Sequence, residues 1–511
     1  MRLLRRNALG VYAVYAAAIA SGLIVTPIVV RTLGQQAFGV WTFIGGITIY
    51  LSVLDLGVGP AIVRFAAEAR GRGESDDLNA IASSGLAMYA AIGLVTLPIG
   101  VALAWLVPWL GHAPAGLVWD ARVATLLVVL SLALRFPLGL FNNLLVARQR
   151  WDLQNLGGFV GTALYAILVA ALLPTVGGGI VLLAALTLGT SLVRLTLPLL
   201  WLKRELPELR VRRRFVTRAR VRELTTFSSS NFLVHVSQKI VFSTDVIVVG
   251  IVLGAASAGV YGVPAKLFGL VFGIGTAVTS LMFPAFAELE GADARDRQRR
   301  LLLSGLRAGT ALMLILALPL LLIPDLLISA WLREPGYGGS YAVMAILAGV
   351  LLVHQPIYVL TQFLIARARQ RQAAWASIVA TGANLALSFL LAWTWGIQGV
   401  AVSTLVTDLL LFAWIIPRYA APAASTTSAA LLRAILRPVL PAAAVAAVVL
   451  VALARVWHPD SLVALAPLGA LWAVTAIAAI WWFGFSEDER RRLGVELRHG
   501  RATAPAAAVD V

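Results

Sequence analysis

The residues best placed to do chemistry lie in one long apolar stretch near the middle of the chain. Asn231, His235 and Lys239 are spaced four residues apart, so they share one face of a helix. An ammonium group deep in an apolar segment needs water, an anion or an acid opposite it. This face is therefore predicted either to line a wet cavity or to form a buried pair with Asp245 or Asp408.

Other basic side chains also lie inside apolar stretches. They are Arg135, Arg194, Lys266 and His354. Long basic side chains at this depth either face a cavity or extend to the headgroup layer. An offset of 220 positions, which aligns residue 33 with residue 253, aligns Arg135 with Gln355. His354 directly precedes Gln355 in the sequence. Related positions in two parts of the chain are thus polar, which favours a lined cavity.

Acidic side chains are rarer inside the apolar stretches. Asp408 lies near the middle of one, where a carboxylate is expected to be protonated, to pair with a cation or to bind a coupling ion. Asp55 and Asp245 lie nearer the ends of their stretches and are weaker candidates for ion coupling. Because basic groups outnumber acids at this depth, a polar anion is the transported substrate that best explains them.

The sequence disfavours enzyme chemistry. There is no Cys, so a thiolate nucleophile, a disulfide and a Cys metal site are excluded. The five histidines form no HExxH or HxH pair, and no Gly-Lys-Ser/Thr phosphate loop is present. The glycine-rich segment 269–275 lies in an apolar stretch, where close helix packing explains it better. We therefore expect no catalytic residue, metal or cofactor.

Composition places the chain in a membrane. Of 511 residues 60% are hydrophobic and 13% charged, with a mean hydropathy of +0.88, which leaves too little polar surface for a soluble protein. The net charge of +17 then reflects basic cytoplasmic loops. The N-terminus resembles a signal peptide, but its apolar run continues to Val30, so we expect a retained first helix.

Apolar runs of about 20 residues predict fourteen membrane-spanning helices. The predicted spans are 8–30, 37–57, 80–108, 118–142, 154–174, 178–201, 226–252, 258–285, 301–323, 339–366, 374–394, 397–417, 436–456 and 462–483. With a cytoplasmic N-terminus every alternate loop carries arginines, as the positive-inside rule requires. Both termini are therefore predicted to be cytoplasmic.

The longest predicted cytoplasmic loop, 203–224, holds nine Lys and Arg residues. We expect it to connect two halves of the chain and to contact anionic lipid headgroups. Binding of nucleic acid is the disfavoured alternative, because Phe215 is the loop's only aromatic residue for base stacking.

The chain contains an internal repeat. Residues 33–41 (LGQQAFGVW) align with residues 253–261 (LGAASAGVY), and this register holds without a gap as far as Gly71 and Gly291. Six spans precede the loop 203–224, so the two copies enter the membrane from the same side and are parallel repeats. The predicted domains are an N-lobe 1–202, the connector 203–224, a C-lobe 225–417, two further spans in 418–485 and a partly disordered cytoplasmic tail 486–511.

The start of the chain carries a family resemblance. Thr26-Pro27, the segment 31–41, the segment 50–57 (YLSVLDLG) and Val63-Arg64 resemble the start of polysaccharide flippases. These are the O-antigen and exopolysaccharide translocases of the multidrug/oligosaccharidyl-lipid/polysaccharide (MOP) superfamily. The fourteen spans and the duplicated halves are similar over essentially the whole length.

The resemblance implies an all-α fold with a V-shaped pair of pseudo-symmetric six-helix lobes and two C-terminal helices. It implies a bacterial inner-membrane protein that moves an undecaprenyl-pyrophosphate-linked oligosaccharide between leaflets by alternating access. Arg31, Lys239 and Lys266 are compatible with the family's use of basic cavity residues for pyrophosphate or acidic sugars. The implied partners are the lipid-linked oligosaccharide, anionic lipids, and a polysaccharide polymerase and glycosyltransferases; the expected state is a monomer.

Two other functions remain open. An ion-coupled multidrug or small-molecule exporter of the same superfamily predicts drug sensitivity on deletion and no surface-glycan defect, although such exporters typically have twelve spans. A membrane scaffold would not need Lys239 or Asp408. The lipid II flippase branch is disfavoured because no charge lies between Ala8 and Val30.

Overall fold

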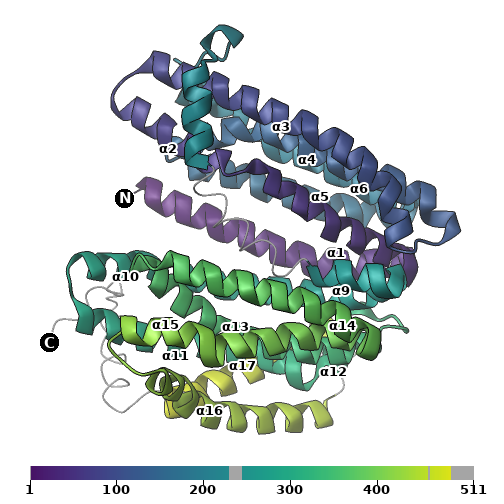
Figure 1. The fold of residues 1–511 in the computed structure, drawn as a ribbon. Coiled ribbons are helices and arrows are strands. Elements are labelled where there is room, and N and C mark those ends of the chain that lie inside the picture. Colours follow the sequence, from purple (N-terminus) through teal and green to yellow (C-terminus); the bar gives the residue numbers. More distant parts are fainter. Residues whose placement is uncertain (1, 229–243, 458–460, 485–511) are drawn as a thin grey trace. The chain divides into compact units, whose positions relative to one another are not determined.

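In the computed structural model the described residues are 2–228, 244–457 and 461–484, and all their regular structure is helical (Figure 1). The predicted all-α membrane fold is therefore confirmed. Asn231, His235, Lys239 and the whole predicted tail 486–511 lie outside the described residues.

The described helices include eleven apolar stretches long enough to cross a membrane. Three of these stretches, Gly10–Gly71, Thr244–Gly291 and Gln370–Ala423, are far longer than one crossing requires. Each contains a sharp kink at a glycine with positive φ. The kinks are at Gly34, Gly254 and Gly396. Each kink falls between two predicted spans, so the eleven stretches are consistent with the predicted fourteen.

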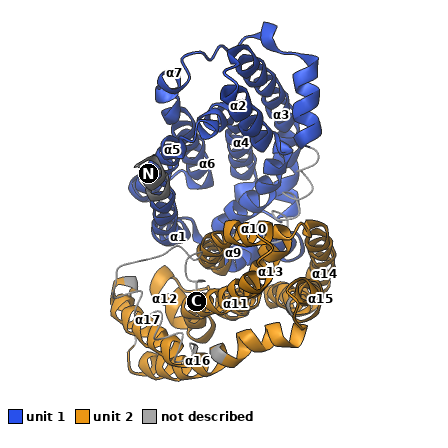
Figure 2. Cartoon of the chain, turned by 90° about the vertical axis from the view of Figure 1, so that its left-hand side faces the viewer, with its two compact units in different colours: residues 1–262 blue, residues 263–511 orange. Residues whose placement is uncertain are grey.

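The chain divides into two compact units, residues 1–262 and 263–511 (Figure 2). The first unit contains α1 (Arg2–Leu51), η1 (Ser52–Asp55), α2 (Val58–Gly71), α3 (Ser75–Leu110), η2 (Ala115–Leu117), α4 (Val118–Ala147), α5 (Trp151–Val176), α6 (Gly179–Thr196), η3 (Leu197–Trp201), α7 (Leu202–Glu205), η4 (Arg213–Phe215), the helical residues 218–228 and the start of α9 (Thr244–Ser280). The predicted division at the connector 203–224 stays a prediction.

The second unit contains the rest of α9 and the elements that follow it. They are α10 (Met282–Gly291), α11 (Arg295–Leu322), α12 (Pro324–Leu332), α13 (Gly339–Ala366), α14 (Gln370–Leu410), the π-helical turn η5 (Leu411–Ile415), α15 (Ile416–Ala423), α16 (Ser428–Val456) and α17 (Leu462–Gly484). Most long helices match predicted spans. The amphipathic α2 and the short α12 had been expected as loops, because neither is long enough to give a membrane signal.

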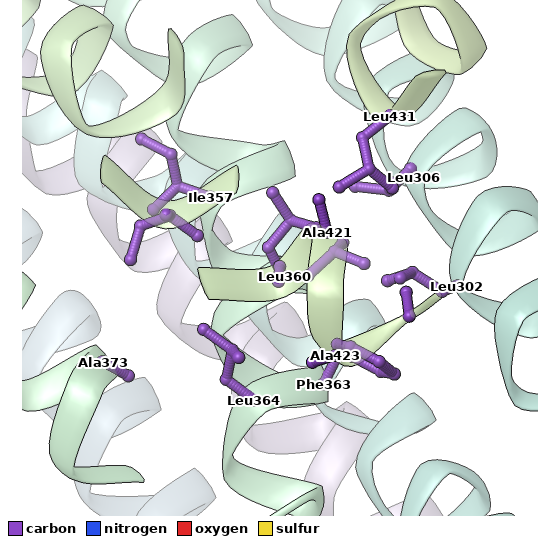
Figure 3. Packing of buried hydrophobic residues seen from close by; sticks show 14 of the residues in the cluster. Leu302, Leu306, Ile357, Leu360, Phe363, Leu364, Ala373, Ala421, Ala423 and Leu431 are labelled. Carbon is purple, nitrogen blue, oxygen red and sulfur yellow. The ribbon is translucent and has the colours of Figure 1, made fainter. Parts of the chain in front are cut away.

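Apolar side chains spaced one helical turn apart hold the second unit together. Leu302 and Leu306 of α11 are fully buried against Leu360 and Phe363 of α13, with Ala421 of α15 beside them (Figure 3). Three- and four-residue spacings put these side chains on one face of each helix, so the faces pack along their length.

The sequence repeat is also a repeat of backbone conformation. Gly34 (φ 72°, ψ 172°) and Gly254 (φ 86°, ψ 172°) are equivalent in the repeat and share a conformation that only glycine adopts readily. The same register persists downstream, because α3 and α11 begin at equivalent positions, each shortly after a residue with positive φ, Gly73 or Asp293. The predicted duplication is therefore present in the fold.

Further along, the offset between the repeats shortens by one position. The positive-φ residues Gln149 and Ala368 each lie in the turn after α4 or α13, and they correspond to each other in this shorter register. The internal prolines of these helices, Pro137 and Pro356, have the same offset. The shorter register pairs Arg135 with His354, so the predicted pairing of Arg135 with Gln355 is wrong by one position.

The two copies of the glycine motif meet inside the first unit. A Cβ on Gly39 would clash with the carbonyl oxygen of Ala255 and lie 3.0 Å from the backbone nitrogen of Gly259. A Cβ on Gly259 would lie 2.6 Å from the carbonyl oxygen of Gln35 and 3.1 Å from Cα of Gly39. Gly39 and Gly259 are equivalent in the repeat, and each needs to be glycine so that the other's helix can approach.

Candidate functional site

The first unit holds a hydrogen-bonded cluster around Asp55. The Tyr89 hydroxyl donates to Oδ1 of Asp55 at 2.8 Å and accepts a hydrogen bond from Nδ2 of Asn143 at 3.2 Å. A Cβ on Gly59 would lie 3.1 Å from the Tyr89 hydroxyl and 3.2 Å from Nδ2 of Asn143, so a glycine leaves room for the cluster. These bonds hold the Asp55 carboxylate in a fixed orientation between α3 and α4.

The turn after η1 brings Asp55 to this position. Leu56 (φ 51°) and Gly57 (φ 80°) both have left-handed conformations, which end η1 and start α2 in a new direction. A glycine is favoured at the second of these positions, where a Cβ would also lie 3.0 Å from the Ser228 carbonyl oxygen.

Two predicted basic residues lie together beside this cluster. Arg135 of α4 and Arg194 of α6 are exposed, and their charges interact with each other; Arg135 also interacts with Tyr89. Gly161 of α5 lets α5 pack closely against α6 at Arg194, because a Cβ there would lie 2.7 Å from Cβ of Arg194. Neither guanidinium forms a salt bridge among the described residues. Two guanidinium groups whose charges interact in this way have the chemistry that binds a phosphate-type anion.

The second unit holds a different polar group. Nδ1 of His354 on α13 lies 2.9 Å from Oδ2 of Asp408 on α14, and the Phe272 ring lies 5.2 Å from the imidazole. The side chains of His354 and Asp408 are only 15% and 4% exposed. Asp408 therefore has the imidazole of His354 as its partner, and the three predicted alternatives for this carboxylate stay predictions.

Two further networks surround this pair. Nε2 of Gln355 donates to Oγ1 of Thr279 at 2.5 Å and to the Gly275 carbonyl at 3.3 Å. Nδ2 of Asn384 donates to Oγ1 of Thr404 at 3.0 Å. These bonds satisfy amide groups that would otherwise be costly at this depth.

The remaining predicted site residues are not part of either cluster. The side chains of Arg31 and Lys266 are exposed. Asp245 is buried, and its Oδ2 accepts a 2.7 Å hydrogen bond from the Tyr261 hydroxyl. Within the described part of the chain, no group of three or more His, Asp or Glu side chains is arranged to hold a metal ion.

The basic connector is packed against the first unit. Backbone N–H groups of Arg210, Arg212 and Thr217 donate to side chains on α3. The acceptors are Asn79 (2.6 Å), Ser83 (3.2 Å) and Ser84 (3.3 Å), all buried. Leu206 and Leu224 are buried in the core formed by α2, α3 and α4. The connector is thus fixed to the first unit along its length.

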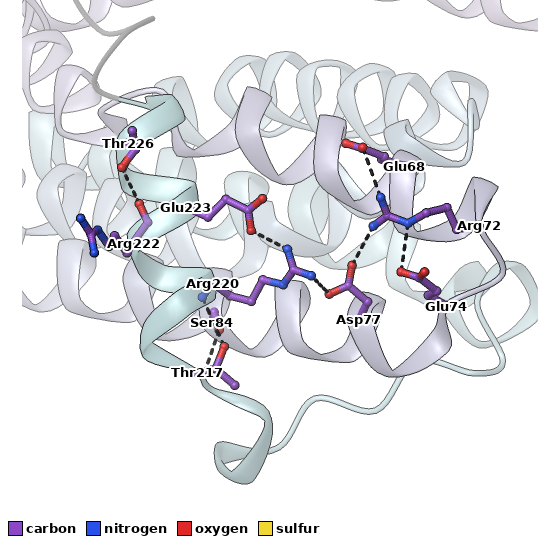
Figure 4. Close-up of polar contacts among 10 residues, drawn as sticks. All are labelled: Glu68, Arg72, Glu74, Asp77, Ser84, Thr217, Arg220, Arg222, Glu223 and Thr226. Carbon is purple, nitrogen blue, oxygen red and sulfur yellow. Dashed lines mark hydrogen bonds and ion pairs between the residues drawn. The ribbon is translucent and has the colours of Figure 1, made fainter.

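Ion pairs add to this attachment (Figure 4). Asp77 of α3 forms ion pairs with Arg220 of the connector and with Arg72. Nη2 of Arg72 lies 3.2 Å from Oδ2 of Asp77. Burial lowers the pKa of Arg220, but the hydrogen bond to Glu223 and the charge of Asp77 outweigh it, so the pKa is raised overall. These partners therefore stabilise the charged form of Arg220.

Sequence reasoning missed Tyr89, Asn143 and Asn384, because uncharged polar residues are common in apolar helices and carry no signal of their own. It also missed the role of Asn79, Ser83 and Ser84. Their four- and five-residue spacing places them near one face of a helix, which was the available signal.

A family model described as "Polysaccharide biosynthesis protein" matches residues 4–290, more than half of the chain. The chain belongs to this family. The resemblance first seen at residues 26–64 is thereby confirmed.

One curated relative and two solved structures extend this result. The uncharacterized membrane protein EpsK of Bacillus subtilis (strain 168) is 23% identical over 399 residues, covering 77% of this chain and 78% of EpsK. The lipid II flippase MurJ in an inward closed conformation matches with a TM-score of 0.73 at 13% identity, covering 95% of this chain and 99% of that one. An inward-facing MATE family multidrug resistance transporter of the MOP superfamily matches with a TM-score of 0.66 at 15% identity, covering 82% and 95%. This polysaccharide biosynthesis protein therefore has the MOP fold.

Proposed function

We propose that this protein is a flippase that moves an undecaprenyl-pyrophosphate-linked oligosaccharide across the bacterial inner membrane. The observation that carries the proposal is the pair Arg135–Arg194 at bilayer depth, in a member of a polysaccharide biosynthesis family with the fold of a lipid flippase. Unpaired cations at this depth are costly unless they meet an anion. The diphosphate of a lipid-linked sugar supplies one.

The transport mechanism follows from this chemistry. The sugar and diphosphate cross in a polar, cationic environment while the polyprenyl chain stays in lipid. Residues 1–202 and 225–417 rock against each other and expose the substrate to each leaflet in turn. The termini lie in the cytoplasm, the protein acts as a monomer, and the glycosyltransferases and polymerase that make and extend the sugar act before and after it.

Removing the positive charge tests the proposal. The assay reconstitutes the protein in liposomes and follows inward and outward movement of a fluorescent undecaprenyl-pyrophosphate-linked sugar. A charge-assisted hydrogen bond to phosphate is worth about 1.5–3 kcal/mol, so Arg135→Gln should lower the flipping rate roughly 10- to 100-fold. Arg135→Lys should retain part of the rate. Lys239 lies outside the described residues, and Lys239→Ala is expected to abolish export of the glycan.

Arg122→Gln is the matched control. Arg122 lies on the same helix, where its guanidinium stacks 3.9 Å from the ring centroid of Trp105. It should flip the probe at the wild-type rate. Equal rates for Arg135→Gln and wild type would refute the role of the cationic pair. A deletion strain with normal surface polysaccharide and new drug sensitivity would instead favour the small-molecule exporter.

A further inference from the structure

The two repeats differ at one equivalent position in the membrane. The shorter register pairs Arg135 of α4 with His354 of α13, each two residues before the internal proline of its helix. Arg135 always carries a positive charge, whereas a histidine gains and loses its charge between about pH 5 and 8. The same position is thus permanently cationic in one repeat and titratable in the other.

The acid beside His354 is also specific to the second repeat. Asp408 approaches Nδ1 of His354 at 2.9 Å, while the residue that the same register pairs with Asp408 is Gly189. A carboxylate next to Nδ1 orients the ring and stabilises the imidazolium form. The second proton then binds at Nε2, on the far side of the ring.

Among the described residues, the charged groups on the helices around His354 lie as follows. On α11, Gly305 and Gly309 face α13, because a Cβ there would contact Val359 or Gln355. Arg307 lies two residues from each glycine and so points to the other side of α11. From α9 the facing group is the ring of Phe272, and Lys266 is six residues away on that helix.

The remaining charged residues on neighbouring helices are further along or at the surface. Glu290 of α10 pairs with Arg367, thirteen residues beyond His354 on α13. Asp325 of α12 and Arg418 of α15 are exposed. Asp408 is therefore the acid that the described structure places against the imidazole.

We propose that His354 and Asp408 form the proton-binding site that couples transport to a proton gradient. Uptake of one proton at Nε2 converts the neutral imidazole, whose Nδ1–H donates to Asp408, into an imidazolium paired with the carboxylate. The pair thereby changes from a net charge of −1 to zero, whereas Arg135 keeps its charge throughout. Release of the same proton on the other side of the membrane restores the negative charge of the pair. The inference rests on the proposed flippase function for its role in coupling, but proton binding stands independently of it.

Proton binding is tested without any substrate. The chain has only five histidines, so ¹⁵N-histidine NMR of the full protein in liposomes resolves few signals, and His354→Gln identifies one by its loss. We expect that signal to change from the neutral to the protonated form as the sample pH is varied from 8 to 5, and Asp408→Asn to alter this response. His112→Gln, an exposed loop residue, should leave it unchanged. A His354 signal fixed in one form across this range, or indifferent to Asp408→Asn, overturns the proposal.

Coupling is tested by the flux of a fluorescent undecaprenyl pyrophosphate. One coupled proton lets a gradient of one pH unit hold about a tenfold ratio of probe between the leaflets. Wild type and His112→Gln should reach this ratio, while His354→Gln, Asp408→Asn and His354→Arg should flip the probe to equal distribution. Retention of the ratio by Asp408→Asn refutes coupling at this site. Failure of the wild type to flip the probe refutes the flippase function and leaves the NMR result to decide proton binding.

Discussion

The contact between Gly39 and Gly259 makes a quantitative prediction for a single methyl group. A Cβ at Gly39 would clash with the Ala255 carbonyl and crowd the nitrogen of Gly259, and backbone atoms cannot move aside as side chains do. Overpacking of this kind costs about 1–3 kcal/mol, and the clash with backbone atoms puts this contact at the upper end, about 3 kcal/mol. The better helix propensity of Ala returns about 1 kcal/mol, so Gly39→Ala should destabilise the first unit by about 2 kcal/mol.

Gly45 offers a matched control six residues further along the same helix. It is exposed, and a Cβ there would meet nothing within 4 Å. Gly45→Ala should therefore gain about 1 kcal/mol from propensity alone. The two variants make the same chemical change, and their stabilities should shift in opposite directions and differ by about 3 kcal/mol.

Thermal unfolding of the purified protein measures the difference. For a unit of this size 1 kcal/mol corresponds to about 2 °C, so Gly39→Ala should unfold about 4 °C below wild type and Gly45→Ala about 2 °C above it. Gly259→Ala should behave like Gly39→Ala. If Gly39→Ala unfolds at or above the temperature of Gly45→Ala, the close crossing of these helices is wrong.

Two further predictions concern loops. Asp77→Asn should weaken the attachment of the connector by about 1 kcal/mol, because its ion pairs with Arg72 and Arg220 are lost. Proteolysis within 206–224 should then be faster than in wild type at low salt and nearly equal at high salt, where the pairs are screened. Arg222→Gln removes the charge of an exposed arginine and should not change the rate. Tyr337 is buried, and desolvation together with the charge of Glu334 raises its pKa to about 12. The folded state thus favours the neutral phenol. The contribution of Tyr337 to the free energy of unfolding is complete below about pH 10 and is lost as the pH rises toward 12. Tyr337→Phe should flatten the fall of the unfolding temperature between pH 10 and 12, and an unchanged fall would contradict the assignment.

The long helices could be predicted because a membrane span is a local signal. An apolar run of about 20 residues is visible in the sequence. The three gaps between merged spans contain Gly34, Gly254 and Gly396, the residues at which the helices kink. The repeat was predictable for a similar reason, since Gly39 and Gly259 occur in matching motifs. Short elements such as α2 were missed because their burial comes from neighbouring helices.

The site was predicted less well because it depends on partners distant in sequence. A basic residue in an apolar stretch is visible in the sequence, so Arg135, Arg194 and His354 could be named as candidates, and their role stays a proposal. Sequence alone left three outcomes open for Asp408, and only the packing of α13 against α14 selects His354 as its partner. The pairing of Arg135 with His354 was missed because the offset changes by one position between the repeat motif and α4.

The contact of Gly39 with Gly259 bears on the origin of the chain. In a homodimer with a dyad, the same residue of each subunit meets its own copy at the axis. Equivalent glycines in contact are what a gene duplication and fusion of such a dimer would leave behind. Once the copies shared one polypeptide, each could change alone, and Arg135 and His354 are one place where they did.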